Sequence, residues 1–376
     1  MVGNKRIKVF FIKLYKKNTN TASENRFHCI HEMVNASFET EIIKTKEINK
    51  NFHNYRLLRG LCNKLRVLQA TIQILRKRSK YDINILYLFG VDPLLSLYYY
   101  LYARIFNFIL VSERNELPNS IIKGERLKEL LERVLIYPWY YKLFDGYTLI
   151  SDELIKHYSS YVSKKQVIYK LPMTVDFSRF KNVNTDKSLK YVFYAGSLNN
   201  SKDGIEFLIK AFLAENNRLK DVFLFIAWND DSHNREYLIN KINCNNIKLL
   251  GEVKREDIPQ YLMNASVCVL PRPDSLQARG GFPTKLGEYL ATGNPVIVSD
   301  VGEIPNYLTD TEVFFVSNNN LESDLRKKLL EVFDNYESAI QKGIHGKIKA
   351  KEYFSLENNS SIVKEFLLTT VKKKLQ

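Results

Sequence analysis

Residues 280–300 read GGFPTKLGEYLATGNPVIVSD, and this stretch decides the fold. Pro283 stands where proline favours the first turn of a helix, and Gly293 followed by Asn-Pro is typical of a helix end. The apolar run that begins at Val296 is typical of a strand covered on both faces. A short helix followed directly by a buried strand is the repeating unit of a parallel α/β sheet, so the stretch predicts a doubly wound α/β domain.

The same alternation runs along the rest of the chain. Apolar strands with helices between them are predicted in the second half at 191–194, 222–227, 247–250, 267–270, 296–298 and 313–316. The strands predicted in the first half are 8–15, 40–45, 83–89, 108–111, 147–150 and 167–169. The pattern breaks at Leu171–Phe180. We therefore expect two doubly wound parallel-sheet domains, 1–180 and 181–343, that face a central cleft, and a helical tail, 344–376, that packs back on the first domain.

Charge is distributed unevenly between these two halves. The 376-residue chain has a net charge of +15, and residues 1–181 hold 31 Lys and Arg against 16 Asp and Glu. The remaining residues hold 25 of each, so all of the surplus lies in the first half. Such a field attracts nucleic acid, an anionic lipid surface or a phosphorylated substrate.

Hydropathy and cysteine usage favour a cytoplasmic protein that is soluble or peripheral to a membrane. Lys8 and Lys13 interrupt the first apolar run, which makes it a poor signal peptide, and no run reaches the roughly 18 uncharged apolar residues of a membrane span. The four cysteines have neither disulfide nor metal-site spacing, so we expect reduced thiols and no bound metal. The segments 97–106 and 134–144 are rich in aromatic and basic residues, which suits either a membrane interface or ordinary core packing.

The loop that follows the strand at 267–270 is the strongest candidate for a ligand site. Gly280 and Gly281 allow close backbone approach, and the helix that follows directs its N-terminal partial charge at the crevice, where a phosphate can bind. Lys285 in the first turn of that helix would add positive charge. Glu288 lies one turn further on the same face, where its carboxylate can accept hydrogen bonds from two ribose hydroxyls.

Four segments in register resemble glycosyltransferase family 4 of the GT-B superfamily, in particular members that build bacterial surface polysaccharides. PTKLGEYLATGNPVIVSD (283–300) resembles the donor-binding signature, and FYAGSLNNSKDG (193–204) resembles the segment that holds the diphosphate. IKLLGEV (247–253) resembles the strand and glycine beside the base. Val175, Asp176 and Phe180 resemble the hinge between the domains.

The resemblance implies a retaining glycosyltransferase that moves a sugar from a nucleotide-diphosphate donor, a UDP- or GDP-sugar, to a saccharide or lipid-linked saccharide acceptor. It implies no cofactor and no metal, a role for Lys202 and Lys285 at the diphosphate, and a role for Glu288 at the ribose. The further donor-binding candidates are Gly196, Ser197, Gly251, Val253, Arg279, Gly280, Gly281, Phe282 and Thr284. On the acceptor side, Glu113, Arg114 and Glu116 follow a predicted strand, and a surface charge cluster is the alternative reading of these three.

Two positions depart from the family pattern. Gly280 stands where many members have a second glutamate, eight residues before Glu288, and Ser197 stands where an arginine is common. The donor sugar would then be held by other groups, with Asp274 and Arg279 as candidates. The alternatives to a glycosyltransferase are a sugar-nucleotide epimerase of the same fold, a nucleic-acid-directed enzyme and a catalytically inactive GT-B protein.

Overall fold

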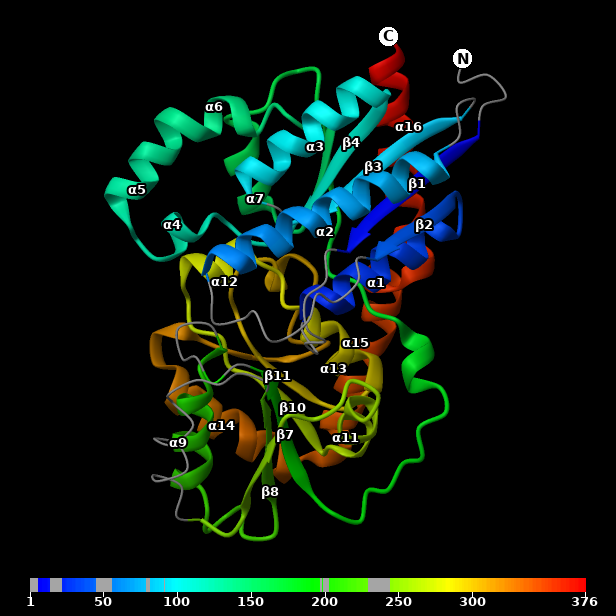
Figure 1. Cartoon of the computed structure of the whole chain (residues 1–376). Helices are drawn as coiled ribbons and strands as arrows, with labels where there is room; N and C mark the ends of the chain where they lie inside the picture. The colour runs from blue at the N-terminus through cyan, green and yellow to red at the C-terminus, as the bar shows by residue number, and fades with distance from the viewer. Residues whose placement is uncertain are drawn as a thin grey trace.

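Two domains, each built on a parallel sheet between layers of helices, make up the protein (Figure 1). The computed structural model describes residues 6–13, 22–44, 56–78, 82–90, 92–196, 198, 203–228 and 244–376. The first sheet takes its strands from residues 7–170 and the second from residues 191–316. The prediction of two doubly wound α/β domains is confirmed.

The first sheet has the strand order β2-β1-β3-β4-β5-β6, and its pairings are parallel. The strands are β1 (Ile7–Lys13), β2 (Glu39–Lys44), β3 (Ile83–Phe89), β4 (Phe108–Arg114), β5 (Gly146–Leu149) and β6 (Val167–Lys170). Every residue of β3 except Phe89 is buried, because helices cover both faces of the sheet.

Helices of the first domain begin and end where local chemistry favours it. Asp92 caps α3 by accepting a hydrogen bond from the Leu95 amide at 3.0 Å, and the helix ends at Asn107 in the left-handed region. The helices are α1 (Ala22–Asn35), α2 (Arg56–Lys77), α3 (Pro93–Phe106), α4 (Asn119–Ile122), α5 (Arg126–Leu131), the π-helical turn η2 (Glu132–Ile136), α6 (Tyr137–Tyr140) and α7 (Asp152–Ser159).

The second sheet has the strand order β12-β11-β10-β7-β8-β9, which reverses direction between β7 and β10. Its strands are β7 (Tyr191–Gly196), β8 (Phe223–Trp228), β9 (Ile247–Gly251), β10 (Val267–Leu270), β11 (Val296–Ser299) and β12 (Phe314–Val316). The helices are α9 (Ile205–Ala214), α11 (Ile258–Asn264), α12 (Leu276–Gly280), α13 (Thr284–Thr292), α14 (Leu321–Asp334) and α15 (Tyr336–Phe354). Ligands of open parallel sheets bind where the strand order reverses, at the carboxyl ends of the strands, which here means beside Gly196 and the loop after Leu270.

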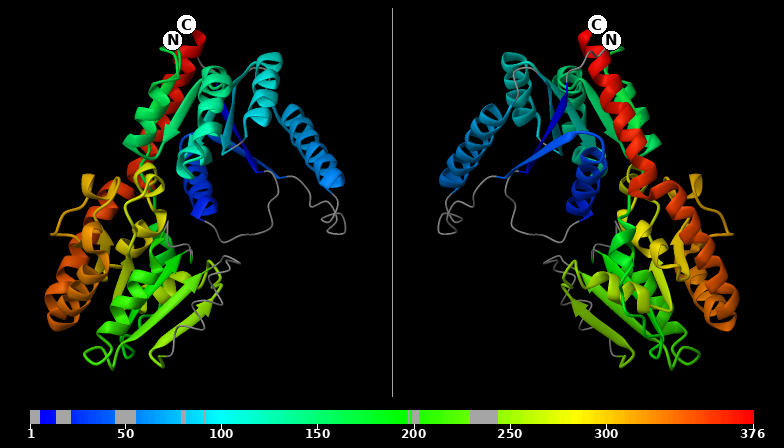
Figure 2. Two further views of the ribbon diagram at one scale, coloured as in Figure 1. Left: turned by 90° about the vertical axis from the view of Figure 1, so that its left-hand side faces the viewer. Right: turned by 90° about the vertical axis from the view of Figure 1, so that its right-hand side faces the viewer.

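A last helix, α16 (Leu356–Leu375), returns to the first domain and runs along it (Figure 2). Its buried Val363, Phe366 and Leu367 share a core with Phe11 and Tyr87. The sequence predicts one helical tail over 344–376, and this is wrong in one respect. The structure has two helices that meet at Ser355, whose extended backbone breaks the first and whose hydroxyl caps the second.

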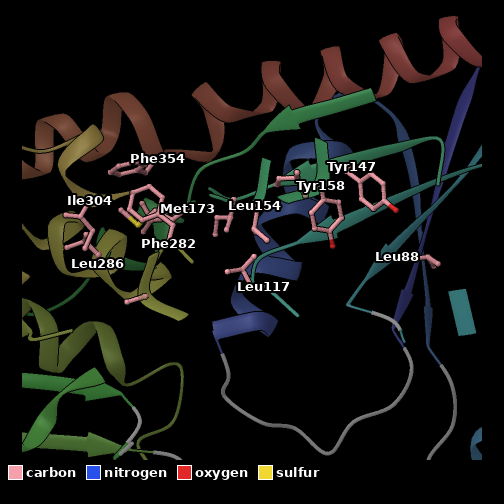
Figure 3. Close-up of a cluster of buried hydrophobic side chains, with 14 of the residues drawn as sticks. Leu88, Leu117, Tyr147, Leu154, Tyr158, Met173, Phe282, Leu286, Ile304 and Phe354 are labelled. Carbon is pink, nitrogen blue, oxygen red and sulfur yellow. The ribbon is translucent and has the colours of Figure 1, made fainter. Parts of the chain in front are cut away.

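Apolar contacts join the two domains on one side. One continuous cluster of buried side chains includes Leu117 and Leu154 of the first domain, Met173 of the connecting segment, and Phe282 and Leu286 of the second (Figure 3). The connecting segment, residues 171–190 between β6 and β7, contains the short helix η3 (Phe177–Phe180). The two domains are therefore packed on each other, and α12 and η3 lie at their junction.

Some sequence predictions fall outside the described residues, namely the helix expected between the strands at 222–227 and 247–250, and the side chain of Cys62. Cys29 and Cys268 are buried free thiols, and Cys244 is a half-buried one. No helix of the described part of the chain is both long and apolar enough to cross a membrane.

Candidate active site

Lys285 lies at the reversal point of the second sheet, in the first turn of α13. Its Nζ is 2.7 Å from Oδ2 of Asp203 and 5.7 Å from the centre of the Tyr194 ring. Gly196 ends β7 directly beside it, and a Cβ at that position would stand 2.4 Å from the lysine Nζ. Gly196 therefore lets the Lys285 ammonium group approach the end of β7. The family resemblance assigns both residues to the binding of the donor.

Arg272 is a second cation of this site, and the sequence analysis missed it. Its Nε is 4.0 Å from Oδ1 of Asp203, and both side chains are buried, with exposed fractions of 4% and 3%. Burial lowers the pKa of the Arg272 guanidinium, and the charges of Asp203 and Glu116 oppose that shift. Two cations thus lie beside one carboxylate at the carboxyl ends of β7 and β10, where a diphosphate would bind. The signal for Arg272 is its position, two residues after the end of β10.

Glu288 lies one turn further along α13 and is paired with Arg179 of η3. Nη2 of Arg179 also donates a hydrogen bond to the Arg255 carbonyl at 2.7 Å. The guanidinium thereby holds Glu288 against the connecting segment and the loop before α11. This ion pair was also absent from the sequence predictions, because its two members are 109 residues apart.

A small pocket opens beside Glu288, between the two domains. Thr284, a predicted donor-binding residue, lines it together with Arg179 and Arg255. The first domain contributes Asn25 and Cys29 of α1. Burial raises the pKa of the Cys29 thiol, so this thiol is a neutral part of the wall.

Gly280 is covered by the first domain. A Cβ at this position would lie 2.7 Å from Cδ1 and Cγ of Leu117, and Ser151 Oγ donates a hydrogen bond to the Gly280 carbonyl at 2.7 Å. The place of the family's second glutamate is therefore taken by a contact between the domains. This close approach is a physical reason for glycine at the position.

The remaining candidates of the loop before α13 differ in orientation. Phe282 is buried and stacks on Tyr307 with ring centres 5.3 Å apart. Arg279 forms two hydrogen bonds with Asp274, of 2.6 and 2.5 Å, on the surface. This pairing lowers the pKa of the Asp274 carboxyl. The two groups proposed as alternative sugar ligands are thus bound to each other.

Gly251 and Val253 lie at the carboxyl end of β9, which is the edge strand of the second sheet. Gly251 ends β9 with a φ of 68°, and Val253 is half-buried beyond it. Gly281 follows α12 and is buried. Lys202 and Ser197 lie outside the described residues, so their roles at the diphosphate stay predictions.

The acceptor-side candidates differ sharply in exposure. Glu113 is 2% exposed and forms a 2.9 Å ion pair with Arg26 Nε, which is itself buried. Arg114 donates a 2.6 Å hydrogen bond to the Tyr140 hydroxyl and lies over the rings of Tyr140 and Phe144. Glu116 is exposed. Contact with an acceptor stays a prediction for all three, and only Glu116 presents its side chain to solvent.

Metal ligands do not gather in the described residues, where no three His, Cys, Asp or Glu side chains form a group that could hold an ion. A reaction without metal stays a prediction from the family resemblance.

Comparison with known proteins points to one class. Residues 189–335, which form most of the second domain, match the family model "Glycosyl transferases group 1". An uncharacterized glycosyltransferase of Methanocaldococcus jannaschii is 27% identical over 118 residues, which cover 31% of this chain and 32% of that relative. The chain thus matches about a third of the length of this curated relative.

Solved structures match almost the whole chain. Sucrose-phosphate synthase from Thermosynechococcus elongatus has a TM-score of 0.72 at 15% identity, and covers 98% of this chain and 100% of its own. HepE of Anabaena, solved in complex with UDP-glucose, has a TM-score of 0.64 at 13% identity, with 96% and 99% covered. A glycosyltransferase from Rickettsia africae has a TM-score of 0.66 at 17% identity, with 97% and 99% covered. These likenesses establish the GT-B fold, and the family model places a group 1 glycosyltransferase domain at residues 189–335.

Proposed function

We propose that this protein is a retaining glycosyltransferase that uses a nucleotide-diphosphate sugar, with UDP or GDP as the nucleotide. Its acceptor is a saccharide or a lipid-linked saccharide in the synthesis of capsule, exopolysaccharide or lipopolysaccharide. In this reaction the bond between the anomeric carbon and the diphosphate oxygen breaks, the acceptor hydroxyl oxygen forms the new glycosidic bond, and the hydroxyl proton is released.

The arrangement of Lys285 and Arg272 around Asp203 is the observation that carries the proposal. Negative charge develops on the diphosphate as the sugar departs, and fixed cations at a helix N-terminus stabilise it without reorganising. The ammonium of Lys285 is 2.7 Å from Asp203, so a diphosphate has to compete with this carboxylate for both cations. Lys202, adjacent to Asp203 in the chain, is proposed to add a third cation.

Glu288 is proposed to bind the ribose hydroxyls, one helical turn from Lys285. Arg179 occupies Oε1 of the carboxylate, and a ribose hydroxyl can donate to Oε2. The complex of HepE with UDP-glucose supports a UDP-sugar as the first donor to test.

The acceptor and the location are proposed together. A lipid-linked acceptor at the inner face of the plasma membrane requires a protein that reaches the membrane by surface contact, since the described residues contain no spanning helix. The charge surplus of the first half favours an anionic surface as the site of this contact. We therefore propose a cytoplasmic enzyme that is peripheral at the membrane.

Nucleotide binding and turnover test the proposal. Calorimetry with UDP and GDP measures binding, and a panel of UDP- and GDP-sugars with mass spectrometry of the products identifies donor and acceptor. Glu288→Ala is expected to weaken nucleotide binding at least tenfold, whereas Glu337→Ala, an exposed glutamate of α15, should leave it unchanged. The proposal fails if the wild type binds no nucleotide, or if Glu288→Ala binds as tightly as the wild type.

Two rivals receive less support from the described residues. A sugar-nucleotide epimerase needs acid–base groups that converge on the sugar, and none of His28, His31, His157 and His345 lines the pocket beside Glu288. A nucleic-acid-directed enzyme rests on the basic first half alone.

A further inference from the structure

Residues 126–140 form a helical segment whose leucines and valine face solvent. It consists of α5, η2 and α6, and neither α5 nor η2 contains a buried residue. Leu127, Val134 and Leu135 are 73%, 63% and 62% exposed. Leu130 and Leu131, at 57% and 50%, complete the stripe, whose spacing of three and four residues places it on one face. Figure 1 shows this segment extending from the edge of the first domain.

Two neighbouring helices carry exposed apolar stripes as well. On α3 these residues are Leu94, Tyr98, Leu101 and Ile105, and on α2 they are Leu65, Leu68 and Ile72. The two stripes meet where the Tyr98 hydroxyl donates a 3.2 Å hydrogen bond to Thr71 Oγ1. Helix α3 also contacts α6. We call the exposed apolar residues of α2, α3, α5, η2 and α6 the apolar face.

Polar contacts fix the stripe of residues 127–135 toward solvent. Glu132 turns to the opposite side, where Ser120 Oγ and the Tyr137 hydroxyl donate hydrogen bonds of 2.5 and 2.9 Å to its carboxylate. Tyr137, Tyr140 and Tyr141 pack into the core. The aromatic residues thus anchor the segment, and the leucines are left exposed. Exposed apolar surface of this extent marks a site of contact with another protein or with a membrane.

The charge around the segment indicates which kind of partner this surface fits. Five exposed cations border the segment, namely Lys123, Arg126, Lys128, Arg133 and Lys142. Two of them are paired with neighbouring glutamates, and residues 123–142, with five cations and three glutamates, keep a net charge of +2. The whole surplus of +15 lies in the first half of the chain. A second copy placed on the same face would oppose cations to cations, which is unfavourable, whereas an anionic lipid surface attracts them. The indole of Trp139, partly exposed beside the stripe, suits the boundary between headgroups and acyl chains.

The position of the segment relative to the cleft fits the proposed acceptor. The loop after β4 leads directly into α4, and its Leu117 lies against Gly280 at the junction of the domains. The chain therefore passes from the junction of the domains to the apolar face within a few residues.

We propose that the apolar face docks the protein on an anionic membrane, with the leucines of 127–135 in the interface and the flanking cations on lipid headgroups. This inference rests on the proposed function, because it names the surface through which the enzyme would reach a lipid-linked acceptor. The docked cleft opens beside the membrane, and a water-soluble acceptor would not require the contact.

Vesicle flotation of the full chain tests the proposal. The vesicles contain phosphatidylcholine alone, or phosphatidylcholine with phosphatidylglycerol. The wild type is expected to float only with the anionic vesicles, and less so as salt is raised. The variant Leu131→Glu/Leu135→Glu should lose binding at least tenfold. The matched control is Ile348→Glu/Leu375→Glu, which places the same two charges at residues that are each 61% exposed on α15 and α16, and it should bind like the wild type.

Three results would overturn the proposal. The first is no flotation of the wild type, and the second is equal flotation of both variants. The third is a wild-type dimer in sedimentation that binds no vesicles and that the substitutions Leu131→Glu/Leu135→Glu dissociate. UDP and GDP binding measured without vesicles separates this inference from the proposed function. Loss of docking with intact nucleotide binding refutes only the docking surface, and docking without nucleotide binding refutes only the proposed function.

A fluorescence readout guards against misfolding of the variant. The emission of Trp139 should shift to shorter wavelength when anionic vesicles are added, because its indole enters a less polar environment. Trp139→Phe should abolish the shift while leaving the emission of Trp228, the only other tryptophan, in place. A shift that persists in Trp139→Phe would contradict the proposed orientation.

Discussion

Replacing Glu113 by glutamine asks whether this carboxylate holds the fold or binds an acceptor. The side chain is 2% exposed and pairs with Arg26, which is 1% exposed. Arg26 Nη2 donates to the Leu171 carbonyl at 2.8 Å, and Thr148 Oγ1 donates to Glu113. The Arg26–Glu113 pair and its hydrogen bonds therefore connect α1, β4, β5 and the segment that leaves the first domain.

The size of the loss follows from leaving a buried charge unpaired. Glutamine keeps the shape of the side chain but removes the negative charge, so the guanidinium stays buried with only neutral acceptors. Breaking a buried pair in this way costs about 3–5 kcal/mol. Burial raises the pKa of Glu113, so the amide avoids a desolvation cost that the carboxylate bears. The loss should lie near the lower end, about 3 kcal/mol, which corresponds to roughly 6–12 °C in the Tm of a domain of this size.

Thermal and urea unfolding followed by circular dichroism measure this loss. Glu337→Gln, an exposed carboxylate of α15, is the control and should shift the Tm by no more than about 1 °C. Arg26→Met/Glu113→Leu removes both charges and should be less destabilised than Glu113→Gln alone. The reasoning is refuted if Glu113→Gln keeps the wild-type Tm and raises the KM for the acceptor, because Glu113 would then act on substrate.

Three further outcomes follow from the site and its surroundings. Arg179→Met should weaken nucleotide binding about tenfold by releasing the carboxylate of Glu288, with partial recovery in Arg179→Lys, and tighter binding would mean that the arginine blocks the site. Arg272→Gln should lower kcat/KM about a hundredfold through loss of charge at the diphosphate, while Arg218→Gln, an exposed arginine paired with Asp334, should change it little, and equal effects would contradict the assignment. Burial lowers the pKa of His157 from 6.5 to about 4, so between these values the unfolded chain binds a proton that the folded chain does not. Stability should therefore fall as pH falls through this window, and the fall should be smaller in His157→Gln, as Tm measured against pH will show.

Local patterns in the sequence were sufficient for most of the secondary structure. The predicted bounds of the strands at 83–89 and 267–270 agree with the structure. Apolar runs, proline at a helix start and glycine at a helix end act over a few residues, so their effects can be predicted before the tertiary structure is known. Lys285 and Glu288 could be proposed for the same reason, because one helix carries both.

Periodicity cannot say what a helix face meets. The sequence left open whether the segment at 134–144 forms a core or a membrane surface, and the structure divides it. Tyr137, Tyr140 and Tyr141 are buried, whereas Val134 and Leu135 are exposed. Since an apolar stripe looks alike against a sheet or against solvent, only the packing of neighbouring elements distinguishes the two.

The sequence by itself therefore determined the α/β class, the two domains and the helix that carries Lys285 and Glu288. The partners of these residues were decided by tertiary structure alone. Lys285 meets Asp203 across 82 residues and Glu288 meets Arg179 across 109. Arg272 joins Asp203 because β10 pairs with β7 at the reversal point of the sheet. Such contacts depend on the order of the strands and on the packing of the domains, and no local pattern records either.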